Sequence, residues 1–413
     1  MYSSFVGFIN KKFNTDAHYF LHGGFWLTLT QGVVVVSGII TTALLANYLS
    51  PTSYGVYRYL IGLAIIFSSF SLTGLGQSIL QTAAKKYYGF YAETIKINLV
   101  YSLGITAAAV GGAVYYFVFK NPTLAIGCLL IALFQPIINI YQYTPAFLQG
   151  SNRFKESTII QSTRAITTSL ISIGVLLITK SIVILFVTYL LSNALISFVT
   201  DFTYKLKVSE PTDKKILNKY ISYAKHTSVR NIVASISNRL DTVLVFTQLG
   251  AAELAIYSIA TIIPEQIKGS FKNLANLLLP KYAKQEDISS LKVSVVKRSL
   301  QLFVVLTVVM ALYIVVAPYL YQILFPTYHE AILFSQISAL AFPTFILLIP
   351  YSVLQSQLAE AQLHRITLYS SLFQILTLVG FIFAFGLLGA IIAKIVYRVF
   401  LLILTYAYLN KKT

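Results

Sequence analysis

The sequence predicts an all-α integral membrane protein with about twelve transmembrane helices, and three observations support this. Of its residues, 57% are hydrophobic and only 11% are charged, whereas soluble domains carry about 25% charged residues. Apolar runs of about 20 residues recur along the whole chain, and each is long enough to cross a hydrocarbon core about 30 Å thick. The connections between these runs are alternately rich and poor in lysine and arginine.

The apolar runs give the expected helices in chain order. They lie near residues 25–49, 55–80, 97–119, 123–148, 157–179, 181–203, 222–249, 252–279, 296–317, 330–358, 366–385 and 387–409. The first run exceeds the roughly 7–15-residue apolar core of a signal peptide, so we expect it to be retained as a span. No soluble domain of ordinary size fits between the runs.

Lysine and arginine gather in every second connection. They are Lys11 and Lys12 before the first span, Lys85, Lys86 and Lys96 after the second, Arg153 and Lys155 after the fourth, Lys205, Lys207, Lys214, Lys215 and Lys219 after the sixth, Lys281, Lys284, Lys292, Lys297 and Arg298 after the eighth, Arg365 after the tenth, and Lys411 and Lys412 at the end. Cytoplasmic loops collect these residues, so both termini are predicted to be cytoplasmic. Orientation against anionic lipids accounts for most of the net charge of +18, and no nucleic-acid partner is expected.

The sequence offers no pattern for metal, cofactor or nucleotide chemistry. Cys128 is the single cysteine, and the five histidines are scattered without ligand spacing. The chain contains no P-loop, no His-Glu-x-x-His motif and no complete dinucleotide fingerprint. We therefore expect no cofactor, no metal and no enzymatic activity.

Two short internal echoes predict a duplicated architecture. "LSPTSYGVYRYL" at 49–60 matches "LGAAELAIYSIA" at 249–260, and "LQGSNRFKES" at 148–157 matches "LAEAQLHRIT" at 358–367. Both echoes fall at equivalent points of the topology that loop charge gives. Because six spans return the chain to its starting side, the halves share one orientation, a parallel repeat. The expected domains are a six-helix lobe at 1–204, a basic cytoplasmic linker at 205–219 and a second six-helix lobe at 220–413.

The span "SVRNIVASISNRLDTVLVFTQLG" at 228–250 contains three charged residues. A charge at the centre of a membrane helix costs about 2.5–3.5 kcal/mol on insertion scales, so such residues usually face a bundle interior or a wet cavity. One face of this helix, or the positions beside it, carries Arg230, Asn231, Ser237, Asn238 and Asp241. This polar stripe predicts a water-filled cleft, in which Asp241 is a candidate for ion coupling.

Arg239 falls on the apolar side of the same helix and needs a partner. Glu265, Lys268 and Lys272 follow one another at helical spacing on the next, antiparallel span. We expect Arg239 and Glu265 to form a structural ion pair, and Lys268 and Lys272 to face the cleft with Arg230. Snorkelling or helix-to-helix pairing is the alternative for these residues, above all for Lys272.

Weaker candidates lie on other spans. Arg164 is about two turns inside the fifth span, and Lys394 and Arg398 share a face of the twelfth. The predicted substrate-binding residues are Arg230, Lys268, Lys272, Asn231, Asn238, Arg164, Lys394 and Arg398.

Three segments carry a resemblance to a known family. They are "LLANYLSPTSYGVYRYL" at 44–60, "AFLQGSNRFK" at 146–155 and "NRLDTVLVFTQLGAAELAIYSIA" at 238–260. The chain resembles the polysaccharide-transport members of the multidrug/oligosaccharidyl-lipid/polysaccharide exporter (MOP) superfamily, which include bacterial O-antigen and capsule-type flippases. The resemblance implies two six-helix bundles in a V shape with alternating access. It also implies a place in the bacterial cytoplasmic membrane and transport of undecaprenyl-pyrophosphate-linked oligosaccharides.

The expected partners follow from this function. They are the lipid-linked oligosaccharide, membrane lipids and the polysaccharide polymerase machinery, and the protein is expected to act as a monomer. Lysine and arginine would hold the pyrophosphate, and hydroxyl and amide side chains would meet the sugar. An ion-coupled small-molecule or drug exporter of the same superfamily is the main alternative, although an exporter of cationic drugs would favour an acidic cleft. A polymerase would require a large external loop, and a purely structural protein would have little reason to bury so many charges.

Overall fold

The computed structural model describes residues 17–205, 213–276, 288–356 and 360–411. Every regular element in these ranges is a helix, so the predicted all-α class is confirmed. Eight helical segments of the described chain are long and apolar enough to cross a membrane. The last of them, Ala361–Leu409, contains two of the predicted spans.

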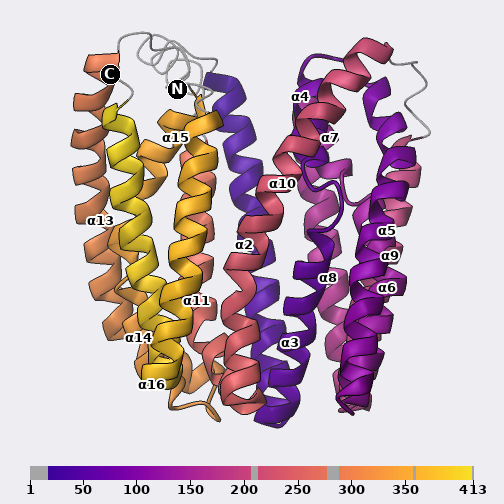
Figure 1. Cartoon of the computed structure of the whole chain (residues 1–413), viewed down its shortest axis with the longest axis vertical. Coiled ribbons are helices and arrows are strands. Elements are labelled where there is room, and N and C mark those ends of the chain that lie inside the picture. Colours follow the sequence, from indigo (N-terminus) through magenta and orange to yellow (C-terminus); the bar gives the residue numbers. More distant parts are fainter. Residues whose placement is uncertain (1–16, 206–212, 277–287, 357–359, 412–413) are drawn as a thin grey trace. The chain divides into compact units, whose positions relative to one another are not determined.

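The helices follow the predicted spans in chain order (Figure 1). They are α2 (Ala17–Tyr48), α3 (Pro51–Ser68), α4 (Leu75–Ala84), α5 (Gly89–Val118), α6 (Pro122–Tyr141), α7 (Thr144–Gly150), α8 (Phe154–Ile178), α9 (Ile182–Lys205), α10 (Lys214–Leu244), the π-helix η1 (Val245–Leu249), α11 (Ala251–Asn276), α13 (Ile288–Leu324), α14 (Ala331–Ala339), the 3₁₀-helix η2 (Phe342–Leu347), α15 (Leu348–Ser356) and α16 (Glu360–Lys411).

Polar side chains fix where several helices begin. Ser50 accepts a hydrogen bond from the Ser53 N–H at 3.2 Å, and proline follows it at the first helical position of α3. Asn121 caps α6 in the same way by accepting from the Leu124 N–H at 3.2 Å. Such caps satisfy backbone donors that would otherwise have no partner at a helix start. The turns of the chain are therefore set locally by its sequence.

Packing divides the chain into two units. One is Gly32–Ala255, and the other is Met1–Gln31 together with Ile256–Thr413. Helix α10 belongs to the first unit because it packs against α3 and α4. These boundaries differ from the predicted lobes at 1–204 and 220–413, and the lobes, which rest on the internal repeat, stay a prediction.

Two predicted spans of the first unit are broken helices. The span predicted at 55–80 is interrupted between Ser68 and Leu75, where Gly74 donates its N–H to Ser228 Oγ on α10 at 2.9 Å. A Cβ atom at Gly74 would lie 2.3 Å from the Ala224 carbonyl oxygen, so only glycine permits this close approach. The span predicted at 123–148 also breaks, between α6 and α7, just before Pro145. Proline lacks the N–H that would continue the helix.

The second unit contains a sharp bend in α16. Gly386 has φ +58° and ψ −132°, which is not a helical conformation. It lies between the spans predicted at 366–385 and 387–409, so their predicted boundary is confirmed. Glycine adopts a positive φ more readily than residues that carry a Cβ atom.

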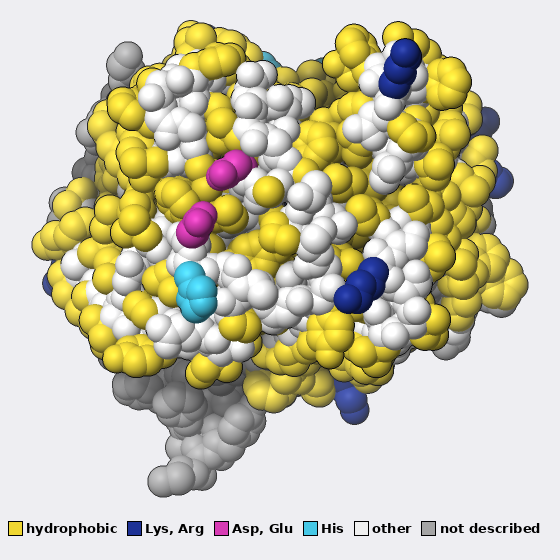
Figure 2. Space-filling view, turned by 90° about the horizontal axis from the view of Figure 1, so that it is seen from below, with side chains coloured by type: hydrophobic (Ala, Val, Ile, Leu, Met, Phe, Trp, Pro, Cys, Tyr) yellow, Lys and Arg dark blue, Asp and Glu magenta, His cyan; other side chains and the backbone are white. Residues whose placement is uncertain are grey.

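Figure 2 shows few charged side chains among the described residues of the face that it draws. Seen from below, this face is mostly hydrophobic or uncharged and polar, with only scattered basic and acidic groups (Figure 2). Such a face suits the weakly charged connections that the sequence predicts on one side of the membrane.

Candidate functional site

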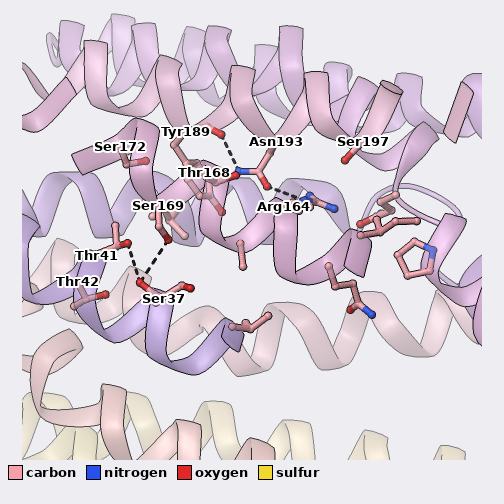
Figure 3. Close-up of a pocket in the computed structure, with 18 of the residues that line it drawn as sticks. Ser37, Thr41, Thr42, Arg164, Thr168, Ser169, Ser172, Tyr189, Asn193 and Ser197 are labelled. Atoms are coloured by element: carbon pink, nitrogen blue, oxygen red, sulfur yellow. Dashed lines mark hydrogen bonds between the residues drawn. The ribbon is translucent and has the colours of Figure 1, made fainter. Parts of the chain in front are cut away.

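A cavity of about 680 Å³ lies within the Gly32–Ala255 unit. Helices α2, α3, α6, α7, α8 and α9 contribute to its walls (Figure 3). Its polar lining consists of Ser37, Thr41, Thr42, Tyr54, Tyr57, Arg58, Tyr141, Gln142, Gln149, Gln161, Arg164, Thr168, Ser169, Ser172, Tyr189, Asn193, Ser197 and Thr200. Among the residues that the structure describes, the cavity lining includes two arginines and no carboxylate, so this lining is electropositive.

Arg164 is held in this cavity by α9. Its Nε donates a hydrogen bond to Asn193 Oδ1 at 2.9 Å, and Asn193 Nδ2 donates to the Tyr189 carbonyl oxygen at 2.8 Å (Figure 3). The contact with Asn193 fixes one edge of the guanidinium and does not use its Nη donors. Guanidinium groups pair with carboxylate and phosphate through two parallel hydrogen bonds. Arg164 is therefore positioned to bind an anionic group of a ligand.

Hydroxyl groups cover another part of the cavity. Thr41 Oγ1 donates to the Ser37 carbonyl oxygen at 2.8 Å, and Ser169 Oγ lies 3.5 Å from the same oxygen. A hydroxyl that donates to a carbonyl keeps lone pairs that can accept from a ligand. This wall can therefore accept hydrogen bonds from the hydroxyls of a sugar.

A second cluster of charge lies in the other unit, around Glu265 of α11. Its Oε1 is 2.5 Å from Arg398 Nη2 and 3.2 Å from Lys394 Nζ, both on α16, and its Oε2 is 3.4 Å from Lys268 Nζ. The structure thus brings together three of the predicted substrate-binding residues around one carboxylate. Lys394 Nζ also lies 3.5 Å from the hydroxyl of Tyr257.

The partners described for Glu265 all lie in its own packing unit, on α11 and α16. Arg239 belongs to the other packing unit, and its pairing with Glu265 stays a prediction. Lys272 is a residue of α11, but the structure does not describe its side chain. Its predicted contact with a substrate therefore also stays a prediction.

The predicted polar stripe of α10 is used in part for packing. Asn231 Nδ2 donates to Thr73 Oγ1 at 3.2 Å, which ties α10 to the break before α4. Ser237 and Asp241 are only 1% and 5% exposed, and Asp241 Oδ1 accepts from the Thr242 N–H at 2.6 Å. Tight packing of α10 against α3 explains this burial.

Arg230 and Asn238 are more accessible members of the same helix. Arg230 is partly buried and Asn238 is exposed. Their role as substrate ligands and that of Asp241 in ion coupling stay predictions. Within the described residues there is no group of three or more His, Cys, Asp or Glu side chains that could hold a metal ion.

Most residues that line the cavity are not among the predicted site residues, although the sequence contains a pattern that indicates them. Gln161, Arg164, Thr168 and Ser172 repeat at intervals of 3 or 4 on α8, and Tyr189, Asn193, Ser197 and Thr200 do so on α9. This spacing places each set on one helix face. A search for polar residues at this spacing, whether charged or not, would have identified the cavity walls that α8 and α9 form.

The comparisons with known proteins place the chain in a family. Residues 44–333 match the family described as "Polysaccharide biosynthesis protein", and the chain belongs to this family. The match confirms the resemblance carried by the three sequence segments. No curated protein matches the chain.

Solved structures show which fold the chain has. An outward-facing multidrug resistance MATE family transporter of the MOP superfamily aligns with a TM-score of 0.65 and 13% identity, covering 94% of each chain. The inward-facing conformation of such a transporter gives a TM-score of 0.64 at 15% identity, again covering 94% of each chain. A MOP superfamily transporter from Pyrococcus furiosus, described by the reversed polarity of its binding pocket, gives 0.64 at 12% identity over 95% of both chains. The protein therefore has the fold of MOP superfamily transporters.

Proposed function

We propose that the protein is a flippase that moves an undecaprenyl-pyrophosphate-linked oligosaccharide across the membrane by alternating access. The oligosaccharide would be the repeat unit of an O-antigen, a capsule or an exopolysaccharide. The observation that carries this proposal is the cavity, whose described lining consists of hydroxyls, amides, two arginines and apolar groups and contains no carboxylate. The family and the fold of the chain support it.

The physical need for such a cavity is clear. A lipid-linked sugar cannot cross hydrocarbon unaided, because each unsatisfied polar group costs several kcal/mol there. The cavity supplies hydroxyl and amide partners for the sugar, and Arg164 supplies charge-assisted donors for an anionic group. The isoprenoid tail can stay in lipid throughout. Since the sequence contains no P-loop, the energy would come from an ion gradient, the membrane potential or removal of the product.

An ion-coupled exporter of small molecules or drugs is the second candidate, because structural neighbours include multidrug transporters. The charge of the cavity distinguishes the two. A cationic drug would be repelled by Arg58 and Arg164, whereas an anionic lipid-linked sugar would be attracted. The polysaccharide polymerase machinery and membrane lipids are the proposed partners, and the proposed functional unit is a monomer.

Reconstitution tests the proposal directly. The assay uses vesicles that contain the purified protein and a fluorescent undecaprenyl-pyrophosphate-linked oligosaccharide in both leaflets. A glycosidase added outside these vesicles should reach nearly all of the sugar. Protein-free vesicles should protect about half of the label, because the bilayer blocks unaided flipping. Uptake of a cationic dye without exposure of the sugar would support the drug exporter and exclude the flippase.

We also propose a bacterial cytoplasmic membrane location with both termini and the 205–219 linker in the cytoplasm. The proposal rests on the alternation of basic connections along the chain. In a Cys128→Ala background, single cysteines at positions 3, 212 and 411 should resist a membrane-impermeant thiol reagent in intact cells. Cysteines at 120 and 180, in the weakly charged turns, should react. Rapid labelling at position 212 would rule out the six-plus-six topology.

A further inference from the structure

Prolines lie well inside some of the described helices, and each removes one backbone donor. Pro136 is in α6, Pro264 in α11 and Pro318 in α13. Proline has no N–H, so the carbonyl oxygen four residues earlier loses its helical hydrogen bond. An unsatisfied carbonyl is costly inside a membrane, because no water is present to serve it. Each of these helices therefore needs a donor from elsewhere.

The donor at Pro264 is the hydroxyl of Tyr321 on α13. This hydroxyl lies 3.2 Å from the Ala260 carbonyl oxygen, which Pro264 leaves without its helical partner. It also lies 2.9 Å from the adjacent Ile259 carbonyl oxygen. Tyr321 is completely buried, at 0% exposure, and a tyrosine hydroxyl has one proton to donate. Tyr321 thus supplies the hydrogen bond that is missing from α11.

The same arrangement recurs at the other two prolines. Gln336 Nε2 on α14 donates to the Ile314 carbonyl oxygen at 2.9 Å, four residues before Pro318. Thr106 Oγ1 on α5 donates to the Ala132 carbonyl oxygen at 3.3 Å, four residues before the proline of α6. In each case the donor belongs to a different helix from the proline. A donor at every one of these carbonyls indicates a regular way of holding bent helices in this fold.

The charged part of α11 begins directly after its proline. Glu265 follows Pro264, and its Oε1 lies 2.5 Å from Nη2 of Arg398 on α16. The side chain of Arg398 is only 9% exposed, so few other positions are open to it. Hydrogen bonds weaken steeply as distance and angle leave a narrow range. The direction of α11 at Pro264 therefore decides whether Glu265 reaches Arg398.

We propose that Tyr321 is a positioning residue, which replaces the donor that Pro264 lacks, fixes the bend of α11 and so holds Glu265 against Arg398. A proline permits a bend but leaves the two halves of a helix joined by fewer hydrogen bonds. The hydroxyl of Tyr321 is anchored on a separate helix and supplies the missing constraint. This role goes beyond the proposed function and requires no transported ligand.

Thermal midpoints of the purified full-length protein in detergent test the replacement of one donor by the other. Tyr321→Phe should lower the midpoint by about 2 °C or more, because a buried carbonyl loses its donor. In the Pro264→Ala protein the alanine N–H can bond to Ala260, so Tyr321→Phe should cost less than about half as much there. The same loss in both proteins would overturn the proposal.

A matched tyrosine gives the control. Tyr59 of the Gly32–Ala255 unit is 1% exposed, and its hydroxyl forms a hydrogen bond with that of Tyr116 at 2.5 Å. Tyr59→Phe makes the same chemical change far from Pro264 in the chain, and its effect should be equal in the parental and Pro264→Ala proteins. Should Tyr321→Phe fold poorly, Pro264→Ala should restore it, and failure to restore it would contradict the role of the hydroxyl.

The positioning itself is measured through the pair of Glu265 and Arg398. The midpoints of Glu265→Gln, Arg398→Gln and the double variant give the coupling between the two residues. This coupling should fall by about half or more in the Tyr321→Phe protein, whereas the coupling of Arg153 and Glu156, 2.5 Å apart in the other unit, should not change. If Tyr321 served only to satisfy a carbonyl, the coupling of Glu265 and Arg398 would stay the same, and the positioning role would be refuted.

Amide hydrogen exchange decides the question without the Pro264→Ala or glutamine variants. Exchange in the segment 257–265 should be about tenfold faster in Tyr321→Phe than in the parental protein, because the turn around Pro264 opens more often. Tyr59→Phe should leave the exchange of this segment unchanged. Parental exchange rates in Tyr321→Phe would show that the hydroxyl does not hold the bend.

Discussion

Replacing Arg164 with alanine should reduce flipping of the lipid-linked oligosaccharide by about ten- to a hundredfold, because a hydrogen bond to a charged group contributes about 1.5–3 kcal/mol. The side chain lies in the cavity wall, and Asn193 orients it through a single hydrogen bond. Arg164→Lys should recover only part of the rate, since an ammonium cannot present two parallel donors. The initial rate of sugar exposure in reconstituted vesicles measures both effects.

A matched substitution shows whether the loss is specific. Arg365 is an exposed arginine of α16, outside the cavity lining, and Arg365→Ala should flip at the parental rate. Protein abundance and the thermal midpoint in detergent should be similar for both variants. Parental transport by Arg164→Ala would show that the cavity arginine is structural, and the substrate contacts would then have to be sought around Arg230 and Lys268.

The helices could be predicted from the sequence because hydrophobicity is a local property. Runs such as 97–119 and 157–179 can be recognised from hydrophobicity alone, and α5 and α8 cover all but the last residue of each. The break between Ser68 and Leu75 could not be found in this way. It depends on the close approach of Gly74 to the backbone of α10, which is about 150 residues away in the chain. The average hydropathy of a sequence window contains no information about contacts between distant parts of the chain.

The site was only partly predictable for a similar reason. Charge in a membrane span singled out Arg164, Lys394 and Arg398, because each such residue needs a partner. The choice of partner depends on which helices are neighbours. The sequence predicts Arg239, on the preceding helix, as a partner of Glu265, and that pair stays a prediction. The contact of Glu265 with Arg398, which is 133 residues further along the chain, could not be predicted in this way. Uncharged polar residues of the cavity gave no comparable signal, since serine and threonine can satisfy themselves on their own helix.

The two echoed turns of the sequence meet in the first unit, and this contact leads to the second prediction. A Cβ atom at Gly55, near the start of α3, would lie 1.8 Å from the carbonyl oxygen of Ala251, at the start of α11. The clashing oxygen is a backbone atom, so no flexible side chain can move aside. Gly55→Ala should therefore destabilise the protein by about 3 kcal/mol, the upper part of the range for overpacking. The thermal midpoint in detergent should fall by about 5 °C or more, while Gly111→Ala on α5, where nothing lies within 4 Å of the added methyl group, should leave it unchanged or raise it. Equal midpoints for Gly55→Ala and Gly111→Ala would show that the two turns do not pack this closely in the folded protein.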